Sequence, residues 1–544
     1  MADPASVAPE DVAARDDAHL RSLGITPQLN RSLGFVANFA LAFSFISVST
    51  GSFGNFGVGI GLGGPASIFW SWIVVVMGQM LVALVFAELA SHFPVAGSIY
   101  QWSKRLSHRT LGWFTGWFYF WAQVLTVSAV SVIVGYVVAG FTGGGQEFLD
   151  SPSPLGVSNM HTFIAITALF ITTLINAFGV RLLSLLNNIG VATEILGMLV
   201  FALVLLFFAN NQPVSIITSF SGTEAAQNGN LVATFALGMF MSIFILYGFD
   251  TAGTFGEETI DASRQAPRGV LTSVLASGLV GIIFLLAVLL AIPDVQGTID
   301  EGLAGGFPIA TIITTNLDTE LVAGITFGEL YLLVILVSVF VCTLAIQGAA
   351  TRMMFSMGRD RQLPLGGVWG RVNTTFKTPA NAAIAVGVIA AVPILVTGPF
   401  GGFVLSIAAT GLIYLSYLLC NIGVLAARRR GWPREKAWFS LGRWGTPINI
   451  LAIIYGAVIL INIALWEDPM FGDFGTAGRA YWNPPINSFL QLFGTPLDGL
   501  PAWPVFETIV GTLLVFGGLY YAFAIRGRAA RVEADAATGE ATIG

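Results

Sequence analysis

The chain has 544 residues, of which 55% are hydrophobic and only 10% are charged, and its mean hydropathy is +0.79. This apolar excess is greater than the core of a soluble domain needs, so the composition excludes an ordinary soluble protein and predicts a polytopic membrane protein. The two cysteines, Cys342 and Cys420, both fall in apolar runs, and this argues against a disulfide framework or a thiolate metal site.

Apolar runs long enough to cross the membrane recur along almost the whole chain. A hydrocarbon core of about 30 Å needs roughly 20 helical residues. The first thirty residues contain no apolar core, so we expect the first span itself to direct insertion. We predict an all-α integral membrane protein with twelve transmembrane helices, at residues 34–62, 66–91, 111–141, 161–179, 185–209, 232–256, 268–292, 328–356, 380–398, 401–426, 447–466 and 504–525.

The basic residues predict the orientation of these spans. If the N-terminus is inside, every Lys and Arg except Arg479 falls on the inner side. An excess of Lys and Arg marks cytoplasmic loops. We therefore expect a multi-pass protein of the plasma membrane, with both termini cytoplasmic and a basic inner face that suits anionic lipids.

The segments outside the spans are unequal in length. We expect the N-terminal tail, residues 1–33, to be flexible to about Gln28, and the C-terminal tail, residues 529–544, to be flexible as well. The outer loops 293–327 and 467–503 are long. The second of these is predicted either to pack on the membrane surface as a lid or to form an ordinary structured loop.

Two spans far apart in the chain are each interrupted by small polar residues. Ser49-Thr50-Gly51-Ser52 interrupts the first span, and Gly248-Phe249-Asp250-Thr251 interrupts the sixth. Broken helices in corresponding positions are typical of transporters built from inverted repeats. Because five spans separate the two breaks, we predict a five-plus-five inverted repeat with discontinuous helices 1 and 6. The predicted units are residues 34–209 (first repeat), 210–431 (second repeat) and 432–528 (the last two helices with a long extracellular loop).

Short motifs in and beside the spans point to a family. They are Phe43–Gly51, Gly63-Gly64-Pro65, Ala87–Ser91, Phe93–Gly97, Tyr100–Trp102, Tyr247–Thr251, Glu257–Thr259, Ala266–Arg268, Arg352, Met357, Arg359-Asp360, Leu363-Pro364 and Thr378-Pro379. Together they resemble the amino acid/polyamine/organocation (APC) permease superfamily. More narrowly, the chain is similar to its amino acid/choline transporter branch, which includes γ-aminobutyrate permeases.

The resemblance implies a binding site for a small zwitterion at the two breaks. Amides freed after Thr50 and Gly51 would bind the carboxylate, since a helix N-terminus carries partial positive charge. Carbonyls freed near Tyr247 and Gly248 would accept the protons of the ammonium group. Phe249 is either a gate over the substrate or an ordinary packing aromatic. The implied substrate-binding residues are Ser49, Thr50, Gly51, Ser52, Gly248, Phe249 and Asp250.

Two carboxylates in the spans are candidates for coupling. An ionisable residue at membrane depth is expensive and indicates function. Asp250 could hold an amine, bind a coupling proton or tie the broken helix together through hydrogen bonds. In several proton-coupled relatives a lysine of the fifth helix lies near the first break. Glu194 falls near that position and the fifth span has no lysine, so the glutamate itself could carry the proton.

Charged residues near the inner ends of the helices could form gates. Such ion pairs form and break during alternating access, or they are static surface bridges. We expect the glutamates to pair with arginines of the neighbouring segments. The candidate cytoplasmic gate residues are Glu88, Arg105, Glu257, Glu258, Arg268 and Arg352.

The residues and the resemblance together predict a secondary active permease and not an enzyme. The chain lacks the clustered His, Asp or Cys groups of a membrane enzyme and the filter sequence of a channel. We expect proton-coupled uptake of a small amino acid or related amine, with amino acid exchange, or symport of choline, a nucleobase or another solute, as alternatives. The expected partners are the substrate, protons and membrane lipids, with no nucleic acid, cofactor or metal.

Overall fold

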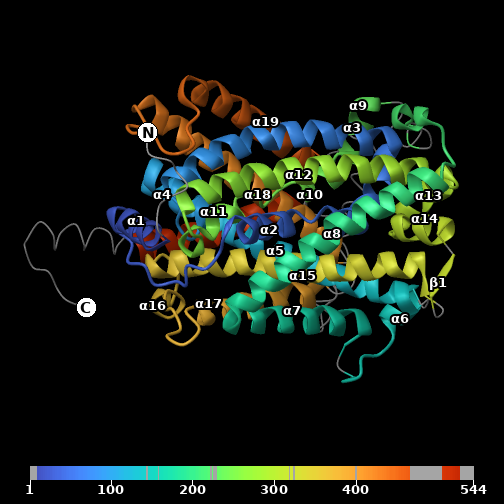
Figure 1. Ribbon diagram of the computed structural model, residues 1–544, viewed down its shortest axis with the longest axis horizontal. Helices are drawn as coiled ribbons and strands as arrows, with labels where there is room; N and C mark the ends of the chain where they lie inside the picture. The colour runs from blue at the N-terminus through green and yellow to red at the C-terminus, as the bar shows by residue number, and fades with distance from the viewer. Residues whose placement is uncertain are drawn as a thin grey trace, which may run out of the picture.

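The fold is a bundle of long helices that run side by side (Figure 1). The computed structural model describes residues 9–526, apart from residues 143–144, 157, 221–222, 224–229, 318, 323–324, 398–400 and 466–504. Within these residues one two-stranded sheet is present. The α-helices are α1 Pro9–Ser22, α2 Phe35–Ile46, α3 Val48–His92, α4 Ser98–Leu106, α5 Arg109–Thr142, α6 Gly145–Asp150, α7 Met160–Phe178, α8 Val180–Phe208, α9 Leu231–Gly238, α10 Phe240–Ile245, α11 Thr251–Thr254, α12 Ala262–Leu290, α13 Val295–Leu303, α14 Pro308–Asn316, α15 Phe327–Arg359, α16 Gly366–Trp369, α17 Ala380–Thr397, α18 Gly401–Arg429, α19 Gly445–Leu465 and α22 Val505–Tyr520. The remaining elements are the 3-10 helices η1 Val214–Thr218, η2 Gly256–Glu258 and η4 Gly442–Trp444, the π-helix η6 Tyr521–Ile525, and the strands β1 Glu320–Val322 and β2 Ile325–Thr326.

The structure confirms the predicted membrane-spanning fold. Among the described residues, ten helical stretches are long and apolar enough to cross a bilayer. One of them, Phe35–His92, contains both the first and the second predicted spans, and the shorter apolar stretch Leu231–Ile245 belongs to the sixth. Each of the twelve predicted spans therefore has a helical counterpart.

The first two spans are joined by a sharp turn inside α3. Gly64 has φ 69° and ψ 178°, and Pro65 follows it. A positive φ favours glycine because other residues place their Cβ against the backbone, and proline suits the first position of a helix. A Cβ added at Gly63 would lie 2.4 Å from the Cα of Gly238 in α9. The Gly-Gly-Pro motif thus reverses the chain and lets α9 approach closely.

Several hydroxyl groups in the bundle interior are satisfied within their own helix. In α5, the hydroxyls of Thr126, Ser128 and Ser131 donate to carbonyls four residues earlier, at 2.7–3.0 Å. These bonds remove most of the cost of burying a hydroxyl. By contrast, large apolar residues of the last span face outward, where lipid would surround them: Phe516 is 65% exposed.

The described part of the N-terminal segment, from residue 9 onward, is folded, which differs from the expected flexible tail. Helix α1 packs on one end of the bundle, where Leu20 and Ile25 are buried against Val95. Arg31 pairs with Asp17 at 2.5 Å. These contacts supply the apolar burial and charge pairing that composition alone did not indicate.

The loop 293–327 contains α13, α14 and the hairpin of β1 and β2. The loop 467–503 with Arg479, and the C-terminal tail from residue 529, lie outside the described residues.

The two ends of the bundle differ in charge and structure. We call one end the basic end: it consists of α1, α4, α11, η2 and residues 359–377 and 428–443, and it holds most of the described Lys and Arg residues. We call the opposite end the loop end: it carries α6, α13, α14 and the hairpin (Figure 1). The two ends close the central site in different ways.

Candidate functional site

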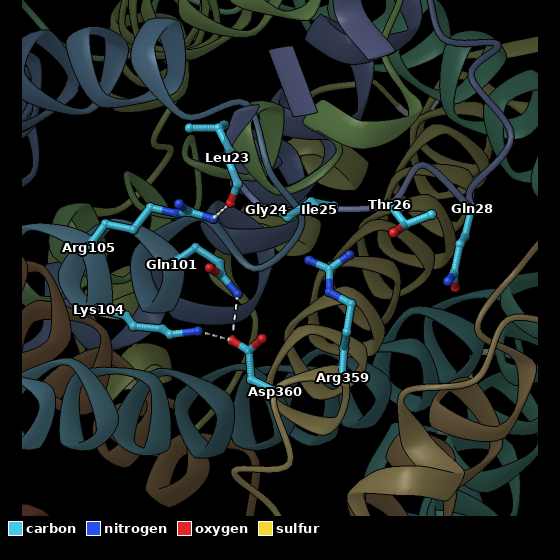
Figure 2. Close-up of a pocket in the computed structure, with 10 residues that line it drawn as sticks. All are labelled: Leu23, Gly24, Ile25, Thr26, Gln28, Gln101, Lys104, Arg105, Arg359 and Asp360. Carbon is cyan, nitrogen blue, oxygen red and sulfur yellow. Dashed lines mark hydrogen bonds and ion pairs between the residues drawn. The ribbon is translucent and has the colours of Figure 1, made fainter. Parts of the chain in front are cut away.

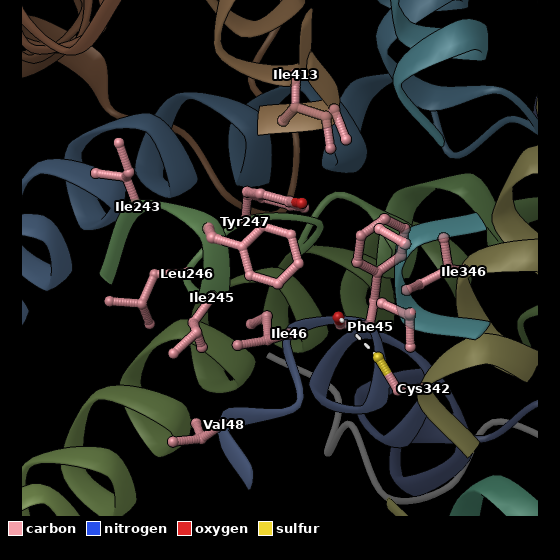
Figure 3. Close-up of a cluster of buried hydrophobic side chains, with 14 of the residues drawn as sticks. Phe45, Ile46, Val48, Ile243, Ile245, Leu246, Tyr247, Cys342, Ile346 and Ile413 are labelled. Atoms are coloured by element: carbon pink, nitrogen blue, oxygen red, sulfur yellow. Dashed lines mark hydrogen bonds between the residues drawn. The ribbon is translucent and has the colours of Figure 1, made fainter. Parts of the chain in front are cut away.

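The two helix breaks lie against each other in the middle of the bundle. A Cβ added at Gly248 would lie only 1.9 Å from Cδ1 of Phe45, and one added at Gly51 only 2.3 Å from Cγ1 of Ile245. The rings of Phe45 and Tyr247 meet edge to face, with centroids 6.2 Å apart. Figure 3 shows Phe45, Ile245 and Tyr247 around the point where α2 and α10 end. Glycine is needed at both contacts because the facing side chains leave no room for a Cβ.

The first break lies slightly before the predicted residues. Helix α2 ends at Ile46, Ser47 adopts the left-handed conformation with φ 36° and ψ 83°, and α3 begins at Val48. The predicted residues Ser49 to Ser52 therefore form the first turn of α3. The amide of Gly51 donates to the carbonyl of Ser47 at 3.0 Å, so it is not free to bind a carboxylate. The unpaired amides of a helix N-terminus are instead the earlier ones.

The second break agrees with the sequence prediction. The chain is non-helical between Ile245 and Thr251, and Gly248 has φ 88°. The amide of Gly248 donates to Tyr417 Oη at 2.9 Å, and its carbonyl accepts the amide of Thr251 at 3.0 Å. The neighbouring carbonyls of Leu246 and Tyr247 accept no hydrogen bond from any residue that the structure describes. These two carbonyls are the acceptors that the break exposes.

A cavity of about 10 Å³ lies between the two breaks. This is room for about one water molecule, so the site is closed. Of the predicted substrate-binding residues, Thr50 and Gly51 line it, whereas Ser49, Ser52, Gly248, Phe249 and Asp250 are not among its lining residues. The full lining is Phe45, Ile46, Ser47, Thr50, Gly51, Thr126, Val130, Phe244, Tyr247, Cys342 and Ile346.

Glu194 of α8 lies at the start of α3. Its Oε1 atom accepts hydrogen bonds from the amide of Ser49 at 3.0 Å, from Ser49 Oγ at 2.7 Å and from Ser47 Oγ at 3.0 Å. The side chain is buried and has no basic partner among the described residues. A carboxylate of the protein therefore already binds the helix N-terminus at which the resemblance places a substrate carboxylate.

Asp250 is held by three hydroxyl groups from three helices. Tyr119 and Tyr417 donate to Oδ1, each at 2.6 Å, and Ser98 donates to Oδ2 at 2.7 Å. The residue is fully buried, and no described Lys or Arg pairs with it. Charge-assisted hydrogen bonds of this length are strong. The carboxylate ties the second break to α4, α5 and α18.

Phe249 packs beside Asp250 and away from the cavity. Its ring lies 6.0 Å from that of Phe86 and 5.5 Å from that of Tyr417, and it is fully buried. This placement matches the packing alternative more closely than the gate. The aromatic residues that line the cavity are Phe45, Phe244 and Tyr247.

Ion pairs close the basic end of the bundle. Arg352 and Glu258 form a bidentate pair at 2.8 and 3.0 Å and are both buried. Arg359 and Glu257 form a second bidentate pair at 3.0 and 2.9 Å. A buried pair is costly to break because one charge would be left without a partner.

The third candidate glutamate also forms an ion pair with an arginine. Glu88 pairs with Arg428 and accepts the amide of Leu441 at 3.0 Å. Of the six predicted gate residues, the three glutamates and Arg352 are thus paired. The sequence analysis did not identify Arg359 and Arg428 as their partners, because only the packing of distant segments brings them together.

The other two predicted gate residues do not form ion pairs within the described chain. Arg105 donates to the carbonyl of Leu23 at 3.0 Å, and the guanidinium of Arg268 lies 4.7 Å from the ring of Trp438. Figure 2 shows Arg105 beside a hollow of about 450 Å³ at the basic end, where Lys104 pairs with Asp360 at 2.7 Å. The N-terminal segment forms one wall of this hollow.

Aromatic packing closes the loop end. Phe307, between α13 and α14, stacks on Phe53 of α3 with centroids 5.3 Å apart and lies 4.3 Å from the ring of Tyr136 of α5. A Cβ at Gly57 would lie 2.8 Å from the carbonyl oxygen of Gly306, so the loop sits directly on the first span. The site is therefore shut by ion pairs at one end and by apolar contacts at the other.

The sequence analysis missed several residues of the cavity. Phe45 belongs to the quoted motif Phe43–Gly51, but nothing in the motif shows which way its ring points. Thr126 and Cys342 are polar or polarisable residues in apolar spans, and this is the only signal that could have marked them. Helices that are buried on all sides show no periodicity that distinguishes the cavity from packing.

Known permeases and transporters are similar to this chain over most of its length. Residues 33–494 match the family model described as amino acid permease. The amino-acid permease BAT1 of Arabidopsis thaliana is 29% identical over 465 residues, covering 82% of this chain and 87% of the relative. Its homolog from Oryza sativa subsp. japonica is 30% identical with the same coverage. The thiamine transporter thi9 of Schizosaccharomyces pombe is 23% identical, covering 85% of this chain and 83% of the relative.

A solved structure shares the fold. The crystal structure of MhsT in complex with L-phenylalanine matches with a TM-score of 0.53 and 14% sequence identity, over 80% of this chain and 99% of that chain. At this identity the likeness concerns the fold alone. The family match extends over most of the chain and includes both helix breaks. The chain therefore belongs to the amino acid permease family of the APC superfamily.

Proposed function

We propose that this permease imports a small amino acid or a related amine across the plasma membrane, driven by protons and working by alternating access. In this proposal the basic end is cytoplasmic, as the positive-inside rule requires. The observation that carries the proposal is the position of Glu194, whose carboxylate binds the first turn of α3 through Ser47 and Ser49.

The substrate would bind where the breaks expose backbone groups. Its ammonium group would donate to the carbonyls of Leu246 and Tyr247, at the C-terminal end of α10. Its carboxylate would bind at the N-terminus of α3, beside Thr50. Both ends of a zwitterion would then meet helix termini of the favourable sign.

Proton coupling follows from two carboxylates that share one helix N-terminus. When Glu194 is ionised, it repels a substrate carboxylate bound to the same turn, and the low dielectric of the interior strengthens this repulsion. When Glu194 is protonated, the repulsion is absent and the hydroxyls of Ser47 and Ser49 still satisfy its oxygen. The substrate and a proton therefore favour each other's binding, as symport requires.

The closed cavity supports an alternating-access cycle. An amino acid needs far more than about 10 Å³, so the substrate can enter or leave only when one end opens. Separation of Phe307 from Phe53 would open the loop end, and separation of the Glu258–Arg352 pair would open the basic end. Asp250 would hold the second break in position during these movements.

Uptake into proteoliposomes tests the proposal. Purified protein would be reconstituted and assayed with radiolabelled amino acids, γ-aminobutyrate and choline, under inward, outward and zero proton gradients. We expect accumulation only when the gradient drives protons in the direction of uptake. Flux that is the same under every gradient would remove proton symport, and flux that requires amino acid on both sides would identify an exchanger.

A further inference from the structure

A second hollow of about 420 Å³ lies at the basic end, outside the transport site. It is formed where the end of α3, helix α4, the end of α18 and the turn after α18 meet. Its polar and aromatic walls come from His92, Arg105, Arg430, Trp432, Arg434 and Glu435. Nothing in the proposed transport cycle uses this hollow.

The hollow has an excess of positive charge. It is lined by three arginines and one carboxylate. Arg105 and Arg430 donate to the backbone carbonyls of Leu23 and Leu106, and none of the three arginines forms an ion pair with a described residue. The Nε atom of Arg105 is buried without a hydrogen-bond acceptor among the described residues.

The gate arginines nearby have a different arrangement. Arg352, Arg359 and Arg428 each pair with a glutamate. Several guanidinium groups around one hollow raise its positive potential, and this potential attracts an anion. Guanidinium groups bind phosphate oxygens through paired hydrogen bonds.

We propose that this hollow binds a phosphate group. The inference rests on the proposed function only for its placement of the basic end in the cytoplasm, where anionic headgroups and soluble phosphorylated compounds both occur. The phosphate would lie among Arg105, Arg430 and Arg434, with the ring of Trp432 as a side wall.

The site would act on the inner gate through Trp432. The guanidinium of Arg428 lies 5.3 Å from the centroid of the Trp432 ring, and Arg428 pairs with Glu88. A ligand that restrains the Trp432 ring would restrain Arg428 through this contact. Phosphate binding would therefore favour the closed basic end.

Binding to the purified full-length protein tests the proposal directly. The probes are inorganic phosphate, dioctanoyl phosphatidylglycerol, and dioctanoylglycerol as a lipid without phosphate. Their affinities would be measured by isothermal titration calorimetry for the natural protein, Arg430→Ala, Arg434→Ala and Arg429→Ala. Arg429 is an exposed neighbour with the same charge that does not line the hollow, so its variant is the matched control.

We expect each substitution in the hollow to weaken binding of the phosphate-bearing probe about five-fold, and the control to leave it unchanged. Binding of phosphatidylglycerol alone identifies a lipid site, and binding of inorganic phosphate as well identifies a site for the bare group. Equal weakening by Arg429→Ala, equal binding of dioctanoylglycerol, or no binding of either phosphate probe would overturn the proposal. Because the readout is binding and not transport, a failure of proton-coupled uptake would leave this result intact.

Discussion

Replacement of Glu194 by glutamine is the sharpest test of the coupling proposal. Glutamine keeps the shape of the side chain and an oxygen that can accept from Ser47 and Ser49, but it cannot become negative. A substrate carboxylate on the first turn of α3 would share that turn with the Glu194 oxygen, and one helical turn spans about 5 Å. At an effective dielectric constant of about 20, two unit charges at that distance repel by about 3 kcal/mol. This corresponds to a loss of about a hundredfold in affinity.

This repulsion also predicts the direction in which substrate affinity changes with pH. In the natural protein the affinity for an amino acid should be highest at low pH, where Glu194 is protonated. It should fall by up to about a hundredfold as the pH rises and the proton leaves. In Glu194→Gln the affinity should stay high across the range. The same variant should catalyse amino acid exchange but lose accumulation driven by a proton gradient.

The assay is equilibrium binding between pH 5 and pH 8.5. A thermal-shift screen of amino acids and amines would first select the ligand that stabilises the protein most. Glu507→Gln is the matched control, since Glu507 is an exposed residue of α22 far from the breaks. The reasoning is refuted if the natural protein binds equally well at all pH values, or if Glu194→Gln keeps the same pH dependence as the natural protein.

Three further predictions concern the breaks and the inner gate. Asp250→Asn should abolish concentrative transport in proteoliposomes while the protein still inserts. The reason is that three hydroxyl groups lose a charged acceptor, and each such hydrogen bond contributes about 1.5–3 kcal/mol to stability. Gly248→Ala should lower the free energy of unfolding by about 3 kcal/mol, measured by denaturation in detergent, because a Cβ has no room there and φ is 88°. Arg352→Ala leaves Glu258 buried without a partner, which destabilises the closed basic end by about 3–5 kcal/mol. The end should therefore open more often, and maleimide labelling of Cys342 in the cavity should accelerate at least about a hundredfold.

Each of these predictions has a control and a contradicting result. Normal accumulation by Asp250→Asn would show that transport does not depend on the charge of this carboxylate or on its charge-assisted hydrogen bonds. Gly511→Ala, at a helical glycine with open space around it, should not destabilise the protein, and equal loss in both glycine variants would contradict the packing argument. Arg15→Ala breaks only a half-exposed pair, and a labelling rate that rises equally in this variant would show that the Arg352 pair is not the gate. Cys420 would be replaced by alanine in the labelling experiments.

The sequence alone predicted the number and position of the spans because membrane insertion depends on local hydropathy. The short fourth span, expected at residues 161–179, is helix α7 at Met160–Phe178. The second break was also predictable, since Gly248 provides a conformation that few other residues adopt. These features depend on the properties of neighbouring residues in the chain.

The first break and the N-terminal helix were decided by tertiary contacts. The break lies at Ser47, which has no glycine to mark it, and hydrogen bonds with Thr50 and Glu194 surround that serine. Helix α1 has a polar composition, so its stability depends on the burial of Leu20 and on the pairing of Asp17 with Arg31.

The candidate site was likewise predictable from the sequence only in part. The amino-acid sequence identified Glu194 and Asp250 as unusual carboxylates, because a charged side chain at membrane depth is costly whichever direction it faces. Only the packed helices decided that Glu194 meets the start of α3, that Phe249 faces Phe86 and Tyr417, and that Phe45 and Tyr247 line the cavity. The physical reason is that hydropathy and backbone freedom are properties of short segments, whereas the direction of a buried side chain depends on neighbours hundreds of residues away.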